Sequence, residues 1–422
     1  VLRRQTLGVP LDRVRTVDVA APLVHRALGL VRLTIGTGRS DRSRSEGIRL
    51  DGLTSVAANH LRDELLHRAE PALEGPRPLR ELARARPAWV AFGPFTLSGV
   101  VTVGVVFGFA WRIASELRFN PERLARESGL TGLSHAGALL LLLPVAALLV
   151  VAAVSAAGYA LAFWDFRLVR DPGGSLQVTR GLIATRSTTI EERRLRGLEF
   201  SEPLLLRAVR GARLIAIATG LRVGRGAERG GSILLPPAPR AEAQRVAAEV
   251  LGSAGPVDAP LIGHGPRARR RRYTRLVLVL VPLLAGLALA WWFVLGGPGL
   301  PAPYYVGAWP VLLLAGLAVA EDRHRSLGHA LIGRTLITRR GSFVRRRCSI
   351  ACDGIIGWNL ERSFFQRRAG LATLVATTAA GRQRYEVQDV PLGEALRLAD
   401  QALPGLLAQF LDPAAPQPPI QS

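Results

Sequence analysis

Three long stretches of this 422-residue chain contain no Asp, Glu, Lys or Arg, and they restrict how it can fold. They are residues 88–111, 136–164 and 276–320. About 20 consecutive apolar residues are enough to cross a bilayer as a helix. The third stretch is interrupted by Gly296-Gly297-Pro298-Gly299, which marks a turn between two helices. The sequence therefore predicts four membrane-spanning helices, at about residues 89–112, 137–163, 275–295 and 304–320.

The chain is strongly basic, and its positive charge resides entirely in arginine. The formal net charge is +23, and all 55 basic residues are Arg. Arginine-rich segments flank the predicted spans on one side, whereas the turn between the third and fourth spans is uncharged. Because cytoplasmic flanks keep their positive residues during insertion, this asymmetry predicts a multi-pass protein of the plasma membrane with cytoplasmic soluble modules. Nucleic acid is the alternative partner for so basic a chain.

Three segments outside the apolar stretches repeat one pattern of residues. Apolar residues match at constant separations, so that Val17 corresponds to Leu198 and to Trp358. Matched apolar residues are expected to face a core rather than solvent. The positions that we expect to be core residues of equivalent strands are Leu198, Leu214, Trp358 and Leu374.

Each repeat also has the same order of expected elements. Period-two stretches separated by glycine turns predict strands, and an apolar-periodic stretch at the end predicts one helix. The closing helices are expected at residues 53–66, 240–251 and 392–407. This order predicts an α+β module in which the helix packs across a strongly bent sheet.

Short motifs give these repeats a family resemblance. The first repeat contains Val9-Pro10-Leu11-Asp12-Arg13-Val14 and then the stretch from Leu23 to Leu30. With a following β-hairpin and a terminal helix, this pattern resembles the bacterial pleckstrin-homology-like (PH-like) domain of membrane proteins. The other repeats depart from the first motif, with Thr189-Ile190-Glu191-Glu192 and Cys348-Ser349-Ile350-Ala351-Cys352 in its place. The resemblance implies two or three such modules between transmembrane hairpins, and a related PH-like membrane protein as a partner.

The predicted fold class is therefore α+β with transmembrane helices. Three PH-like modules are expected to alternate with two transmembrane helical hairpins. The first module lacks most of the opening hairpin, so we expect the N-terminus to be truncated or its start misassigned. The expected parts are a partial module at 1–70, a hairpin at 88–164 with an external loop at 113–135, a module at 165–253, a hairpin at 275–321, a module at 322–411 and a disordered tail at 412–422.

The densest run of positive charge is the best candidate for a binding surface. It comprises Arg267, Arg269, Arg270, Arg271, Arg272 and Arg275, at the entry to the third predicted span. Arginines in such a place lie among lipid phosphates, so these residues are expected to contact the bilayer through anionic phospholipid. The hairpin tips carry further arginines, including Arg382 and Arg384, which are interpreted as solvated turns.

Motifs for catalysis or for cofactor binding are absent from the sequence. The seven histidines fit no catalytic spacing. Cys348 and Cys352 lack the further ligands of a zinc site, and they are expected to be buried or incidental cysteines. We therefore expect no enzyme activity, no metal and no cofactor.

These observations favour a non-enzymatic membrane scaffold whose PH-like modules bind other proteins or each other. The alternative is a component of a transport, export or envelope-defence system that works with a related membrane partner. The predicted spans contain no ionisable Asp, Glu, Lys or Arg, which disfavours coupled transport. Nucleic acid is not expected as a partner, because the basic segments lack an interleaved aromatic platform.

Overall fold

A computed structural model describes residues 16–22, 25, 28–36, 48–67, 79–96, 108, 112, 133–182, 185–220, 232–294 and 302–406. The chain divides into two compact units. The first comprises Val1–Arg194, Glu202–Leu214 and Gly220–Val246, and the second comprises Leu195–Ser201, Ile215–Thr219 and Ala247–Ser422. Most of the predicted loop at 113–135, the tail at 412–422 and the motif at residues 9–14 lie outside the described residues.

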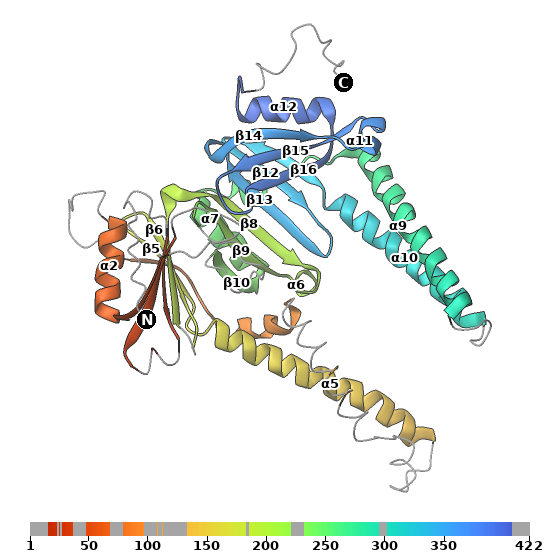
Figure 1. Cartoon of the computed structure of the whole chain (residues 1–422), viewed down its shortest axis with the longest axis horizontal. Helices are drawn as coiled ribbons and strands as arrows, with labels where there is room; N and C mark the ends of the chain where they lie inside the picture. The colour runs from red at the N-terminus through yellow and green to blue at the C-terminus, as the bar shows by residue number, and fades with distance from the viewer. Residues whose placement is uncertain are drawn as a thin grey trace, which may run out of the picture. The chain divides into compact units, whose positions relative to one another are not determined.

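The first unit contains a seven-stranded antiparallel sheet in the order β3-β2-β1-β7-β6-β5-β4. Strands β5 and β6 of this sheet are labelled in Figure 1. Its strands are β1 (Thr16–Ala21), β2 (Leu30–Gly36), β3 (Ile48–Thr54), β4 (Arg80–Arg84), β5 (Arg167–Asp171), β6 (Ser175–Arg180) and β7 (Thr185–Glu191). Helix α2 (Ser55–His67) packs on β2 and β3. The first and second repeats meet inside this sheet, where Val17 of β1 lies opposite Thr189 of β7.

Two further sheets contain the remaining strands. One has six strands in the order β10-β9-β8-β13-β12-β11, and the other has three in the order β14-β15-β16. The strands are β8 (Leu195–Pro203), β9 (Gly211–Ala218), β10 (Ile233–Pro239), β11 (Gly328–Ile332), β12 (Thr335–Arg340), β13 (Val344–Ala351), β14 (Ile355–Glu361), β15 (Leu371–Thr378) and β16 (Arg384–Pro391). The pairing of β8 with β13 joins strands of the second and third repeats.

The secondary structure shows the predicted repeat. Elements of the second and third repeats begin at one constant separation, as in β6 and β12, in β9 and β15, and in the short helices α6 (Leu204–Ala208) and α11 (Phe364–Arg368). The closing helices α7 (Arg240–Leu251) and α12 (Leu392–Ala402) follow directly after β10 and β16. Strands and a closing helix therefore follow one another in the same order in both segments, although α12 ends at Ala402 and not at the expected residue 407.

The four predicted membrane spans are wrong. In the part of the chain that the structure describes, none of the helices combines the length and the unbroken apolar character that crossing a bilayer requires. The fold class is instead β-rich, with three sheets among the residues that the structure describes. The predicted multi-pass localisation in the plasma membrane rested on these spans and is wrong with them.

The reason for this error is that a lack of charge does not show where an apolar surface packs. The first expected span begins inside a 3₁₀ helix, η2 (Pro87–Phe95), which packs on α5 (Leu133–Ala162). Tyr159 on α5 and Phe163, which directly follows the helix, are buried. The Tyr159 hydroxyl donates to the carbonyl oxygen of Pro237 at 2.7 Å. A Cβ on Gly93 would lie only 2.8 Å from the Cβ of Tyr159, so the two helices approach closely.

The other two long helices are α9 (Gly265–Val294) and α10 (Ala302–Arg325). The first turns of α9 carry the arginine run, and α10 ends in the charged segment from Glu321 to Arg325. Both helices contain a proline, Pro282 in α9 and Pro310 in α10. Their charged ends belong to the polar structure of the second unit, and several apolar side chains further along, such as Val279 and Leu314, are exposed.

One hydrophobic core is formed mainly by the third repeat, with Ile217 of β9 added to it. It includes Leu374 and Val387 from the sheet and Leu398 from α12, all of them buried. Three of the four predicted core positions, Leu198, Leu214 and Leu374, are buried. Trp358 is only half-buried and packs against the edge of this core.

Cys348 and Cys352 are buried free thiols, as predicted. Cys348 lies in β13, inside the core of the third repeat. Burial raises the pKa of both thiols, most strongly that of Cys348. The described part of the chain contains no group of three His, Cys, Asp or Glu side chains that could hold a metal ion.

Replacement of Leu374 by Ala should destabilise the third repeat by about 2–5 kcal/mol, because it leaves a cavity at a fully packed position. Trp358→Ala should cost less, since that side chain is half-exposed. Hydrogen exchange of peptides from β15 and β16 in the full chain would measure both changes. Equal protection in Leu374→Ala and the wild type would contradict this description of the core.

Candidate functional site

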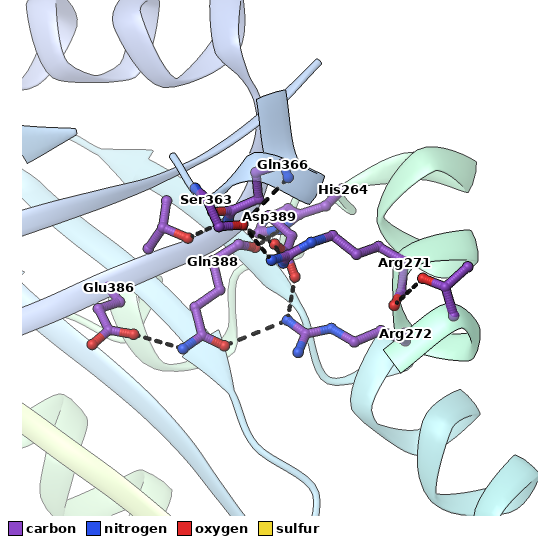
Figure 2. Close-up of polar contacts among 10 residues, drawn as sticks. His264, Arg271, Arg272, Ser363, Gln366, Glu386, Gln388 and Asp389 are labelled. Atoms are coloured by element: carbon purple, nitrogen blue, oxygen red, sulfur yellow. Dashed lines mark hydrogen bonds and ion pairs between the residues drawn. The ribbon is translucent and has the colours of Figure 1, made fainter. Parts of the chain in front are cut away.

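A buried carboxylate, Asp389, lies at the centre of the main polar cluster of the second unit (Figure 2). Asp389 has a φ of 57°, in the left-handed region that residues other than glycine rarely adopt. The pairing of β15 with β16 shifts register between Ala372 and Leu374, opposite this part of β16. Such a bulge redirects a side chain away from the alternation of the strand. The backbone here is therefore shaped to aim one carboxylate at α9.

Two arginines of α9 meet this carboxylate. Arg271 donates to Asp389 Oδ1, and Nη2 of Arg272 lies 2.7 Å from Oδ2. Figure 2 shows both side chains reaching from the helix toward Asp389. All three side chains are almost fully buried. Since a buried charge is costly unless it is paired, the two guanidinium groups and the carboxylate depend on one another.

A short helix closes the cluster on another side. Ser363 and Gln366 form a capping box at the start of α11, which fixes the position of Gln366. The Gln366 amide then donates to Asp389 at 2.9 Å and to the Thr373 hydroxyl at 2.8 Å. Asp389 therefore receives hydrogen bonds from α9 and from α11, which ties both helices to β16.

Two buried histidines lie beside this cluster. Nδ1 of His264 lies 2.6 Å from the carbonyl oxygen of Gln388, and a carbonyl can only accept, so Nδ1 carries the proton. Nε2 of His264 then accepts from Nδ1 of His329 at 3.0 Å. Nε2 of His329 faces Glu394 at 3.4 Å. The pKa of each ring is lowered from 6.5 to about 4, mainly by burial, and for His264 the neighbouring His329 contributes to this shift. Both rings are therefore neutral at pH 7.

A cavity of about 460 Å³ opens next to Asp389. Its walls carry charges of both signs and several amide and hydroxyl groups. They are formed by Arg271, Arg275, Glu361, Arg362, Ser363, Gln366, Thr373, Glu386, Gln388 and Asp389. Ligand pockets for small apolar molecules are lined mainly by hydrophobic side chains. This cavity instead suits a polar or zwitterionic group, such as a peptide segment.

The predicted arginine run divides into two groups in the structure. Arg271 and Arg272 are buried against Asp389, whereas Arg267, Arg269, Arg270 and Arg275 are exposed. Arg269 lies 3.1 Å from Glu321 of α10, and the Tyr273 hydroxyl donates to the same carboxylate at 2.8 Å. Contact of the run with anionic phospholipid stays a prediction. Two of its six side chains serve the interior of the second unit.

The arginines of the hairpin tips also have structural partners where they are described. Arg382 lies 3.2 Å from Glu199, and Arg384 lies 2.8 Å from Glu361. The corresponding tip arginines of the first two repeats lie outside the described residues.

Sequence reasoning missed Asp389, Gln366 and the histidine pair. A signal for Asp389 was present in the repeat. Counted back from the closing helix, the first repeat has Gly52 at this position, with a φ of 80°, and the second has Pro237. Aspartate at a backbone position that suits glycine indicates that the side chain has a role of its own.

Comparison with known families adds to this geometry. Two segments match the bacterial PH domain. These segments are residues 1–69 and 273–404, and the second contains β11 to β16 and Asp389. The match confirms the predicted resemblance at the level of the domain, and it supports a binding or scaffold role. Neither a curated protein nor a solved structure matched the chain.

Replacement of Asp389 by Asn should destabilise the second unit by about 3–5 kcal/mol, because Arg271 and Arg272 would remain buried without their counter-charge. Asparagine tolerates the left-handed backbone, so the change tests the charge rather than the conformation. Urea unfolding of the full chain would measure the loss, and hydrogen exchange of β16 would locate it.

The matched control for this prediction is Asp353→Asn. Asp353 forms an exposed ion pair with Arg196 at 2.8 Å. Exposed pairs contribute at most about 1 kcal/mol. Similar losses in the two variants would show that the buried cluster does not hold the unit together.

The histidine pair predicts a loss of stability in acid. In the unfolded chain both rings bind protons below about pH 6.5, whereas in the folded chain they stay neutral until about pH 4. The unfolded state binds more protons in this window, so the free energy of unfolding falls as the pH decreases from about 6.5 to about 4. Asp389, Arg272 and Glu394 also face the two rings.

Thermal unfolding between pH 4 and pH 7 would measure this dependence. His264→Asn should make it shallower, because one of the two titrating rings is removed. The exposed His60→Asn should leave it unchanged. An unaltered pH dependence in His264→Asn would be evidence against the buried, neutral state of this ring.

Proposed function

We propose that the chain is a non-enzymatic scaffold in which successive PH-like repeats are joined through shared β-sheets and bind other proteins. The observation that carries the proposal is the antiparallel pairing of β1 with β7, which runs from Val17 opposite Thr189 to Ala21 opposite Thr185. Repeats on flexible linkers would move independently of each other. Repeats that share a sheet keep a fixed spacing, which is what a scaffold requires.

An acid–arginine pair supports each of these strand junctions. In the first unit, Nε of Arg186 on β7 donates to Asp18 on β1 at 2.9 Å, and the Thr188 hydroxyl donates to the same carboxylate at 3.0 Å. In the second unit, Glu199 on β8 lies 3.2 Å from Arg346 on β13. Asp18 and Glu199 occupy equivalent places in the repeat, and so do Arg186 and Arg346. The same contact therefore joins the first repeat to the second and the second to the third.

A glycine allows the close approach of β8 to β13. Gly197 has a φ of 156°, and a Cβ at this position would overlap the carbonyl oxygen of Ser349 and lie 3.0 Å from the Cα of Ile350. Any larger residue would push the two strands apart. The pairing of β8 with β13 therefore requires glycine at position 197.

A protein ligand fits the polar cavity better than a small apolar molecule does. The cavity beside Asp389 offers amide, hydroxyl, carboxylate and guanidinium groups, which are the partners that a peptide backbone and its side chains use. The match to the bacterial PH domain supports binding in general, and the polar groups that line the cavity favour a peptide as the ligand.

Replacement of Gly197 by Ala should open the junction of β8 with β13, because the new methyl group collides with the opposing backbone. Gly357→Ala is the matched control. Gly357 holds the equivalent place in the third repeat, and a Cβ there would meet nothing within 4 Å. Hydrogen exchange of the full chain should show faster exchange in β8 and β13 for Gly197→Ala alone. Retained protection of both strands in that variant would refute the shared-sheet scaffold.

A further inference from the structure

Among the described residues, one strand edge is open in the third repeat, whereas the equivalent edge is paired with another strand in the first and second repeats. In the first repeat β1 pairs with β7, and in the second β8 pairs with β13. Their equivalent in the third repeat, β14, is the outermost strand of its sheet in the described part of the chain and pairs there with β15 alone. An uncovered edge presents unpaired N–H and C=O groups, which can pair with another strand.

Side chains on β14 are exposed where their equivalents on β8 are buried. Phe200 on β8 is 8% exposed, whereas its equivalent on β14, Leu360, is 39% exposed. Ile356 on β14 is 66% exposed. The adjacent short helix α11 adds Phe364 and Phe365, which are 62% and 57% exposed. An exposed apolar strip beside an open edge is typical of a docking surface rather than of a solvated strand.

The edge also keeps the feature that permits close strand approach. Gly357 is the equivalent of Gly197, and the space around its missing Cβ is empty. At Gly197 the corresponding space is filled by the backbone of β13. Glycine within a strand weakens it unless another backbone approaches closely, so an open glycine here indicates a place for an incoming strand.

We infer that the outer edge of β14 binds an antiparallel β-strand from a PH-like module of another protein chain. The inference rests on the proposed scaffold function and names the class of its partner. Strand addition would supply main-chain hydrogen bonds, and the apolar strip of β14 and α11 would contact alternate side chains of the incoming strand. The two internal junctions show the geometry that the added strand would adopt.

Two observations favour a different chain over a second copy of this one. The strands that fill this role here, β7 and β13, are already paired with β1 and β8. In addition, the acid of the other two junctions, Asp18 or Glu199, is replaced by Asn359 in β14. An arginine on the incoming strand would find no carboxylate at this position of β14, and it could not form the ion pair seen at the two internal junctions. The preferred strand therefore carries an uncharged hydrogen-bonding residue where β7 and β13 carry Arg186 and Arg346.

A charge-swap experiment tests this inference with the full-length chain. The probes are two synthetic hairpin peptides covering Thr335–Ala351, both with Cys348→Ser and one with Arg346→Gln. The wild-type chain should bind the Gln peptide at least as well as the Arg peptide. Asn359→Glu should reverse this order and favour the Arg peptide by about fivefold, which is the effect expected of one cross-strand ion pair.

Binding must also be located on β14. In hydrogen exchange, either peptide should protect β14, and Gly357→Ala should abolish this protection without changing the free chain. Absence of β14 protection with both peptides, in the wild type and in Asn359→Glu, would overturn the inference. Peptide binding that persists in Gly357→Ala would also overturn it.

Two outcomes separate this inference from others. Concentration-dependent self-association of the chain, with protection of β14 and no peptide added, would show that a second copy fills the edge and would overturn the assignment of a different chain. The scaffold proposal has its own measurement, the protection of β8 and β13 in Gly197→Ala. Failure of one proposal is therefore distinguishable from failure of the other.

Discussion

The pairing of strands between successive repeats is the interaction on which the rest of the structure depends. In the part of the chain that the structure describes, strand β1 of the first repeat, and its equivalents β8 and β14, each have one side that no strand of the same repeat covers. An unpaired strand edge in water can pair with other chains. Here the third strand of the next repeat covers it, as β7 covers β1 and β13 covers β8. The first and second repeats are thus each completed by the repeat that follows. The acid–arginine contact fixes the register, since a slip by one residue would turn Arg186 or Arg346 away from its carboxylate.

The cluster at Asp389 serves a different purpose from these junctions. A carboxylate with two guanidinium groups in a buried place is a poor source of stability compared with apolar packing. Its value lies in geometry: it fixes the first turns of α9 against β16, and Gln366 adds the start of α11 to the same point. The cluster thereby shapes one wall of the neighbouring polar cavity.

The sequence indicated most of the strands, because period-two stretches and glycine turns are local signals. The helix expected at 240–251 is α7, residue for residue. Absence of charge was a weaker guide. It identified the apolar surfaces of η2 and α5, but it could not show that Tyr159 packs against residues far away in the chain, such as Pro237. Asp389 was missed for a related reason: its partners on α9 lie more than a hundred residues earlier, and only the repeat alignment with Gly52 marks its backbone as unusual.

The burial of Cys348 has a consequence for how motions of this chain could be followed. Its thiol lies in β13, the strand that joins the second and third repeats, and burial raises its pKa. The thiolate is the nucleophile that attacks an alkylating reagent, and the reagent must reach it, so the native side chain should be inert while the strand is in place. Reaction would then proceed at the rate at which β13 detaches, and alkylation of one natural residue would time the opening of the junction without any added label.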